Sequence, residues 1–271
     1  MFRDPIRTVG ALAGGFLMLA GSAHAVDGVI EISHACASSA SGCTATGSDT
    51  GGYPVTIGQA GSYRLTSNLT VPANTGGIQI IPGTPGVISI DLNGFEIAGP
   101  ATCGGCPVTS CTGGGSEKGI YSTGAVAGVS IRGGTIRGMG GGGIDITGGV
   151  ETENVAVLQN GGSGIKATVG PAYLFRTAID RNLADGLGVD TNFPAVVRDS
   201  VSSCNGHLGF AVGVSSLVKD NILLTNGGFG LQCGFGAGSG GNVLLNNNGG
   251  GSQISGSCAP LSTNLCNGAP C

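Results

Sequence analysis

The 271-residue sequence contains few charged side chains, no tryptophan and only four tyrosines. Its 11 lysines and arginines are outnumbered by 15 acidic residues, so the net charge is −4 and there is no basic stripe. Nucleic-acid-binding proteins normally carry such a stripe, and we therefore expect no nucleic-acid partner. Beyond residue 25 no apolar run is long enough to cross a bilayer, so we expect the mature chain not to span a membrane.

Glycine is abundant, with 56 residues, but it does not follow the Gly-X-Y period of collagen. Disordered chains are also rich in small residues. Here, however, Val, Ile and Leu recur at regular intervals, which favours a folded core over disorder.

The chain begins MFRDPIRTVGALAGGFLMLAGSAHA, which has the layout of a secretory signal peptide. Arg3 and Arg7 precede an apolar segment, and Ala23 and Ala25 supply small residues at a cleavage point. We expect residues 1–25 to be removed during export, which would deliver the chain to the periplasm, the cell surface or the medium.

Ten cysteines follow this segment, and an even number in an exported chain favours disulfides over zinc. The spacing indicates two local bridges, Cys36 with Cys43 and Cys266 with Cys271. It leaves the other pairings open. The sequence Cys103-Gly-Gly-Cys106 resembles half of a metal knuckle, but no second matched pair accompanies it, and we expect no metal there.

An asparagine stands four residues before a glycine in five segments, QNGGSGI, RNLADGL, CNGHLGF, TNGGFGL and NNNGGGS. The asparagines are Asn160, Asn182, Asn205, Asn226 and Asn247. The glycine recurs every 21 to 24 residues from Gly119 to Gly251. A period of this length with short strands and Gly- and Asn-rich turns is typical of a solenoid.

Each repeat contains two alternating patterns that predict β-strands with one buried face. One strand begins after the glycine, with Leu187, Phe210 and Leu231 in the same inward position; the other places Ile179 and Leu223 in a column. Leucine-rich repeats would need helical periodicity. Calcium-binding nonapeptide repeats would need GGGGIDITG to recur every nine residues, but it occurs once.

The pattern therefore predicts an all-β protein, a right-handed parallel β-helix of about 8–9 coils. Coils are expected over residues 77–254, with a Cys-containing insertion at about 99–117. Residues 26–76 would form an N-terminal cap and the first strands, and residues 255–271 a Cys-bearing C-terminal cap. The five asparagines would form one column at a corner, where Asn tolerates left-handed backbone and nearby glycines supply positive φ.

The period, the Asn column and the segment SYRLTSNLTVPANTGGIQI with ISIDLNGFEIAG resemble the right-handed β-helix repeat proteins exported by bacteria. These proteins share the pectate-lyase-like architecture, and the resemblance covers roughly residues 50–255. The superfamily includes lyases, hydrolases, epimerases and adhesins, so the resemblance implies a fold and leaves the activity open.

Two groups of residues are candidates for chemistry. His207, in NGHLG, is the nearest match to a pectin-hydrolase motif, and Asp185 would be its diagonal neighbour on the previous coil. A His–Asp pair without a nucleophile or second acid is an incomplete catalytic set, and a solvated turn histidine is the simpler interpretation.

The second group is a column containing Arg176, Asp199 and Asp220, with Asn154 below it, which a calcium-dependent lyase would need. Arg198 and Lys219 neighbour the two aspartates, so a row of exposed ion pairs is the simpler interpretation.

A sugar-binding groove would be expected to show exposed aromatic side chains, which contribute stacking area. Tyr121, Phe175 and Phe193 are the candidates, and they form no single column.

We therefore expect a non-enzymatic surface or extracellular protein, structural or binding, with a polysaccharide or cell-surface glycan as candidate partner. The alternative is a polysaccharide lyase or glycoside hydrolase with a reduced His/Asp or calcium-dependent site. We expect no cofactor, with calcium as the alternative. The sequence leaves the oligomeric state open.

Overall fold

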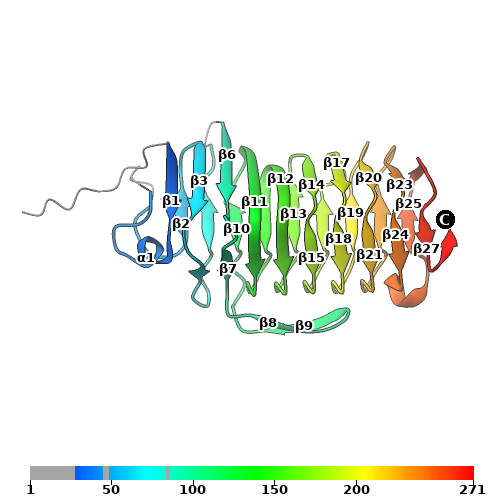
Figure 1. Cartoon of the computed structure of the whole chain (residues 1–271), viewed down its shortest axis with the longest axis horizontal. Helices are drawn as coiled ribbons and strands as arrows, with labels where there is room; N and C mark the ends of the chain where they lie inside the picture. Colours follow the sequence, from blue (N-terminus) through cyan, green and yellow to red (C-terminus); the bar gives the residue numbers. More distant parts are fainter. Residues whose placement is uncertain (1–27, 45–48, 84–85) are drawn as a thin grey trace, which may run out of the picture.

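The computed structural model describes residues 28–44, 49–83 and 86–271, and the expected signal peptide lies outside these residues. The chain forms a parallel β-solenoid of about ten turns, with strands from successive turns side by side along a long axis (Figure 1). The all-β parallel architecture predicted from the repeat is confirmed.

Each complete turn contributes to three faces, which we number in chain order. Face 1 consists of β2 (Val55–Ile57), β5 (Ile78–Ile80), β10 (Ile120–Ser122), the start of β12 (Ile144–Leu158), β13 (Ile165–Thr168), β16 (Leu187–Val189), β19 (Phe210–Val212), β22 (Leu231–Cys233) and β25 (Ile254–Gly256).

Face 2 consists of β1 (Val29–Ile32), β3 (Gly61–Leu65), β6 (Val87–Asp91), the first part of β11 (Val126–Arg137), the middle of β12, β14 (Ala172–Phe175), β17 (Ala195–Arg198), β20 (Leu217–Lys219), β23 (Gly238–Gly240) and β26 (Ala259–Pro260). Face 3 consists of β4 (Leu69–Thr70), β7 (Glu96–Ala98), the ends of β11 and β12, β15 (Ala178–Asp180), β18 (Val201–Ser203), β21 (Ile222–Leu224), β24 (Val243–Leu245) and β27 (Leu265–Cys266).

The core is made of columns of identical inward positions. On face 1, Leu187 pairs in register with Phe210, and Phe210 pairs with Leu231. All three side chains are fully buried, as the alternation predicts. Burying each one contributes ~1.5–3 kcal/mol, so the column stabilises every coil through its neighbours.

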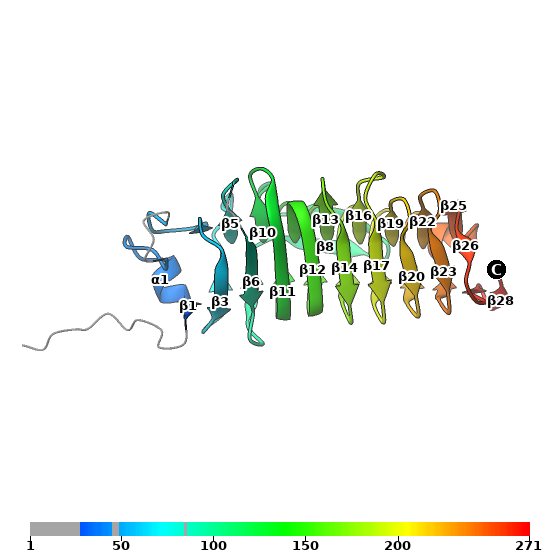
Figure 2. The same ribbon diagram turned by 90° about the horizontal axis from the view of Figure 1, so that it is seen from above.

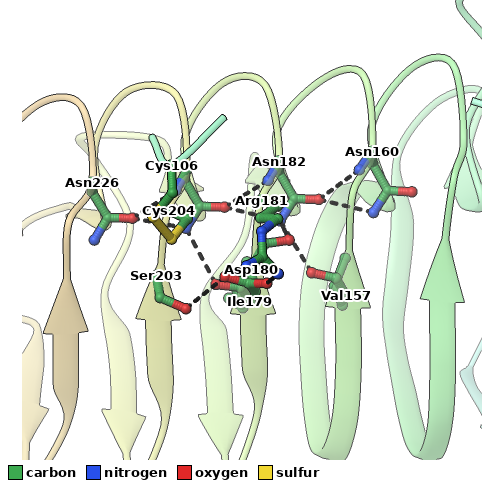
Figure 3. A network of polar contacts seen from close by, with 11 residues as sticks. Cys106, Val157, Asn160, Ile179, Asp180, Arg181, Asn182, Ser203, Cys204 and Asn226 are labelled. Atoms are coloured by element: carbon green, nitrogen blue, oxygen red, sulfur yellow. Dashed lines mark hydrogen bonds and ion pairs between the residues drawn. A yellow bond between two sulfur atoms is a disulfide. The ribbon is translucent and has the colours of Figure 1, made fainter. Parts of the chain in front are cut away.

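The five repeated asparagines form a buried amide ladder at the corner after face 3. Figure 3 shows part of this ladder, with Asn160, Asn182 and Asn226 labelled. In the middle of the ladder, Asn182 Oδ1 accepts hydrogen bonds from the backbone N (3.1 Å) and Nδ2 (2.9 Å) of Asn160. Its Nδ2 donates to Asn205 Oδ1 and to the backbone O of Val157, both at 3.0 Å. Every polar atom of the amide is therefore satisfied within the protein, which makes its burial affordable.

Gln253 ends this ladder. Its Oε1 accepts from the backbone N (3.0 Å) and Nδ2 (2.8 Å) of Asn247, and its Nε2 donates to the Asn247 carbonyl (2.9 Å). A longer amide side chain from the start of the next turn thus takes the place of a further asparagine in the ladder.

The left-handed backbone at this corner lies one residue earlier than the sequence analysis expects. The residues with positive φ directly precede the ladder asparagines and include Gln159 (54°), Arg181 (53°) and Cys204 (54°). The ladder asparagines are instead selected by their hydrogen bonds.

The glycines next to the ladder asparagines, such as Gly161 and Gly206, do not have the positive φ expected of them. The glycines that mark the repeat are required for another reason. A Cβ added at Gly186 would lie 2.5 Å from the Gly209 carbonyl oxygen, and one at Gly209 would lie 2.4 Å from that of Gly230. Neither glycine has a positive φ. Glycine is required there because consecutive coils approach too closely for a side chain.

A second buried polar ladder occupies the bend between faces 2 and 3. The backbone N of Ser200 donates to Asn221 Oδ1 (3.0 Å), and those of Asn221 and Asn242 donate to the next Oδ1 groups, on Asn242 (3.0 Å) and Asn264 (3.1 Å). Toward the N-terminus the same contact is made by the Thr177 backbone N to Ser200 Oγ (3.1 Å). The sequence analysis does not anticipate this ladder.

The cysteine-containing insertion is an antiparallel hairpin of β8 (Thr102–Gly105) and β9 (Val108–Thr112) that lies along the outside of the solenoid (Figure 1). Cys103 and Cys111 close the hairpin, and Cys106 at its tip bonds to Cys204, 98 residues later. The Val108 backbone N also donates to the Cys204 carbonyl (2.9 Å). The hairpin is therefore tied to the Asn corner several coils away.

The two ends differ from each other. At the N-terminal end, β1 already pairs in parallel with β3, and the short helix α1 (His34–Ala37) carries the Cys36–Cys43 disulfide. At the C-terminal end, Cys266 pairs with Cys271, so both local bridges form as the spacing indicates.

The tail is more regular than the expected cap. β26 and β27 continue the parallel ladders, and only β28 (Ala269–Pro270) turns back antiparallel. The Cys233–Cys258 disulfide joins this last coil to the preceding one.

Candidate functional site

A shallow depression interrupts the outward surface of face 1. Register places Asp145, Lys166, Gly188 and Ala211 in one outward column on successive coils. The side chain disappears at Gly188 and is reduced to a methyl group at Ala211. The result is a hollow of about 320 Å³, at the lower end of the ~300–1,000 Å³ typical of small-molecule sites.

Polar side chains line much of this hollow, beside Ala167 and Val189. They include the exposed Lys166, the hydroxyl residues Ser163 and Thr168, and the carboxylates of Asp185 and Asp190. One cation, two hydroxyls and two carboxylates offer both donors and acceptors to a ligand.

Asp185 is held in place by the next coil. Its Oδ1 accepts from the backbone N of Leu208 (3.0 Å) and contacts His207 Nδ1 at 2.6 Å. A Cβ built at Gly188 would meet Asp185 Oδ2 at 3.7 Å and no other atom within 4 Å. Asp185 Oδ2 therefore lies beside the open space over Gly188, where it can accept a ligand hydroxyl.

Asp190 is oriented by its own turn. Its Oδ1 accepts from the backbone N (3.0 Å) and Nδ2 (3.1 Å) of Asn192, the geometry of an Asx turn. Asp185 and Asp190 are therefore held in fixed orientations beside the hollow before any ligand binds, and Lys166 lies next to them.

The structure thus brings together the predicted pair Asp185 and His207. The imidazole is about two-thirds exposed and the carboxylate about one-quarter exposed. This pair could orient a proton-transferring imidazole, although His207 itself stands outside the lining of the hollow.

The calcium-type column lies elsewhere in the coil, at the bend between faces 2 and 3. Asn154, Arg176, Asp199 and Asp220 have φ values of 52°, 48°, 52° and 58°, so they are the left-handed residues of successive bends. In each later coil a strand of face 3, such as β18, separates this bend from the Asp185–His207 region.

The contacts of this column only partly match the expected ion pairs. Lys219 Nζ lies 3.3 Å from Asp220 Oδ2. Arg176 instead turns to the preceding coil, where its Nε donates to Asn154 Oδ1 (2.9 Å) and its Nη2 pairs with Glu153. Asp199 is exposed, and in the part of the chain that the structure describes it has no ion-pair partner.

Over the described ranges, no three or more His, Cys, Asp or Glu side chains are arranged to hold a metal ion. The Cys103 and Cys106 thiols are committed to separate disulfides.

The expected exposed aromatic residues are also corrected by the structure. Tyr121, Phe175 and Phe193 are half-buried, and Phe193 packs against the core. Among the aromatic residues that the structure describes, Tyr173 (39 %) and Phe235 (83 %) are exposed.

Sequence reasoning missed Lys166 and Asp190 as wall residues, and Gly188 as the floor. The available signal is the loss of a side chain in one outward column, but it becomes visible only when the coils are placed in register.

Comparison with protein-family profiles, with curated proteins and with solved structures gave no significant match. The fold and the site define the chain as a disulfide-linked parallel β-solenoid with a polar hollow on face 1. Its ten cysteines form five disulfides, which indicates an oxidising compartment. Among the described residues, no helix has the length and apolar character needed to span a membrane.

Proposed function

We propose that this chain is an exported, non-enzymatic glycan-binding protein of the right-handed, pectate-lyase-like β-helix group from bacteria. The polar hollow over Gly188 carries the proposal. Sugar units present many hydroxyls, and a lysine with two fixed carboxylates can hydrogen-bond them as donor and acceptors. Adjacent coils extend the wall with Asp145 and Gln232, so a chain lying along the axis would meet further polar groups.

Export is supported by the N-terminal signal pattern over residues 1–25 and by the five disulfides. Sequencing the N-terminus of the protein recovered outside the cytoplasm should find Val26. A chain that retains Met1 would contradict this part of the proposal.

Glycan binding is tested with the full mature chain by affinity electrophoresis in gels containing neutral or acidic polysaccharides. Gly188→Leu should abolish retardation, because the new side chain fills the hollow without a clash and without requiring positive φ. Gly104→Leu is the matched control, since that position on the hairpin is equally open. Retardation that survives Gly188→Leu, or that no polysaccharide produces, would sink the proposal.

The second candidate is a polysaccharide lyase or hydrolase, and it is favoured by the 2.6 Å contact between Asp185 and His207 beside the hollow. The chain would be incubated with uronic-acid polysaccharides and calcium while unsaturated products and reducing ends are followed. Turnover lost in His207→Ala would establish this alternative at the Asp185–His207 pair. Turnover lost in Asp199→Ala or Asp220→Ala would place it at the bend instead.

A further inference from the structure

Face 2 presents a broad outward surface away from the glycan site. Its strands stand side by side along the long axis in Figure 2. Two columns of alternate residues cross the middle coils of this face in register; their last members, Gly238 and Gly240, are buried against Leu261 and Ser262 of the next coil. The first column is Ser130, Glu151, Tyr173, Val196, Leu217 and Gly238. The second column is Arg132, Glu153, Phe175, Arg198, Lys219 and Gly240.

One end of this surface contains an apolar hollow of about 220 Å³. Its floor includes Gly128 and Gly149, and its walls include Val87 and Tyr173, which are 64 % and 39 % exposed. A Cβ built at Gly128 would find its nearest neighbour 4.0 Å away. The hollow is therefore open to an apolar group of roughly the size of an aromatic ring.

The turn that enters the other end of this face, between β22 and β23, carries an exposed aromatic side chain. Phe235 is 83 % exposed and lies three residues before Gly238. On the coil of the hollow, Ala127 lies three residues before Ser130, which belongs to the same column as Gly238. The register from β11 to β23 therefore places Phe235, which we call the knob, and the Gly128 hollow on the same edge of face 2, five coils apart.

We propose that face 2 is a contact surface between two copies of this chain, related by a two-fold axis that runs parallel to the strands between β14 and β17. This rotation reverses the order of coils and keeps each column on itself. It places Phe235 of each copy over the Gly128 hollow of the other. A single symmetry operation thus fills both hollows, as an isologous interface requires.

The same rotation brings further side chains of the two columns together, and it also places Glu151 opposite Leu217. Tyr173 meets Val196 of the second copy, Phe175 meets Arg198, and Glu153 meets Lys219. An arginine over an aromatic face and a carboxylate opposite an ammonium are both attractive, and each contact occurs twice.

The present partners of these charges are exposed and weak. Lys219 lies 3.3 Å from Asp220, with both side chains 43–50 % exposed, and the Arg176–Glu153 pair is about half exposed. Exposed surface pairs of this kind contribute little to stability, so exchanging them at an interface has little cost.

The area is sufficient for a specific dimer. Six coils at ~4.8 Å spacing and six residues at ~3.3 Å cover a flat footprint of about 570 Å² on each copy. Both copies together exceed the ~1,000 Å² that separates specific interfaces from casual contacts. Face 1 stays free on both copies, so this inference is independent of glycan binding.

Sedimentation velocity over a concentration series of the full mature chain tests the dimer. The unchanged chain should sediment as a monomer–dimer equilibrium. Phe235→Ser and Gly128→Leu should each raise the dimer dissociation constant about tenfold or more, because one removes the knob and the other fills the hollow. Both positions are open, so neither change should alter thermal unfolding of the monomer, and Lys166→Glu on face 1 is the control. A chain that stays monomeric at about 200 µM, well above typical weak-dimer affinities, or a dimer indifferent to both changes, would overturn the proposal.

A charge exchange provides the second test. Lys219→Glu and Glu153→Lys should each weaken the dimer, because each places like charges opposite one another twice. The double variant Glu153→Lys with Lys219→Glu should recover at least half of the lost affinity on a logarithmic scale. Recovery distinguishes a direct contact from damage to either coil, and its absence would contradict the two-fold placement.

Discussion

The two buried polar ladders solve the same problem with different residues. At the Asn corner, five consecutive coils use asparagine and Gln253 closes the series. At the bend between faces 2 and 3, the series runs from Thr177 through Ser200 to three asparagines. Both ladders supply an acceptor to a backbone N–H of the preceding coil that a sharp bend would otherwise leave unpaired.

The difference is in how each residue continues the ladder. An asparagine side chain both accepts from the previous coil and donates to the next carboxamide, so it couples coils in both directions. Ser200 accepts from Thr177, but its hydroxyl donates to the Arg198 carbonyl of its own coil (2.8 Å). The hydroxyl portion of the second ladder is therefore less cooperative, and we expect it to be less sensitive to substitution.

The largest effect is expected at the middle of the Asn corner. Asn205→Leu removes the acceptor for the backbone N and Nδ2 of Asn182, which are both bonded at 3.0 Å. Two buried donors left without partners should cost ~3–5 kcal/mol of unfolding free energy, measured by urea denaturation. Asn248→Gly, at the exposed neighbour of Asn247, is the control; glycine accepts the left-handed backbone at this position (φ 52°), and the midpoint should change little.

The closing residue of the same ladder should matter less. Gln253→Ala leaves the backbone N and Nδ2 of Asn247 without their acceptor, but residues 248–252 beside them are exposed, so water can reach the freed donors. We expect a loss of ~1–3 kcal/mol, with faster amide hydrogen exchange confined to the last coils. Equal acceleration of exchange at Asn182 would show that the ladder transmits the damage along its whole length.

The hydroxyl portion of the second ladder should respond still more weakly. Ser200→Ala removes one acceptor, the partner of the Thr177 backbone N at 3.1 Å. A loss of ~1–2 kcal/mol is expected in the same urea experiment. A loss as large as that of Asn205→Leu would contradict the distinction drawn between amide and hydroxyl ladders.

These particular residues show what sequence reasoning can and cannot predict. The Asn corner was predictable because one residue type recurs at a fixed offset. The second ladder could not be predicted in this way. Thr, Ser and Asn each offer a side-chain oxygen as acceptor, but they are different residue types, so no single residue type recurs in the sequence. The role of the glycines was predicted wrongly. A close approach between coils and a positive φ both select glycine, so the sequence alone does not distinguish the two causes.

Features that join distant parts of the chain could not be predicted from the spacing of residues in the sequence. The Cys106–Cys204 bridge joins a hairpin tip to a corner 98 residues away, and ten cysteines allow many pairings. The hollow over Gly188 depends on register between three coils. In contrast, the contact of Asp185 with His207 followed from their offsets from the repeat glycine, because a diagonal neighbour in a parallel stack can be counted.

The smallest effect is expected at the exposed bend column, which borders the second ladder. Asp199 has a φ of 52° and directly precedes Ser200, so its position calls for a residue that accepts left-handed backbone. Asparagine accepts this conformation as readily as aspartate, and Asp199→Asn should change unfolding free energy by less than about 0.5 kcal/mol. Asp199→Val should instead cost ~1–2 kcal/mol, because a branched side chain is strained there. If Asp199→Asn left stability intact but abolished polysaccharide turnover, the Asp199 carboxylate would be needed for catalysis. That result would support the lyase alternative. If only Asp199→Val had an effect, the column would serve the bend alone.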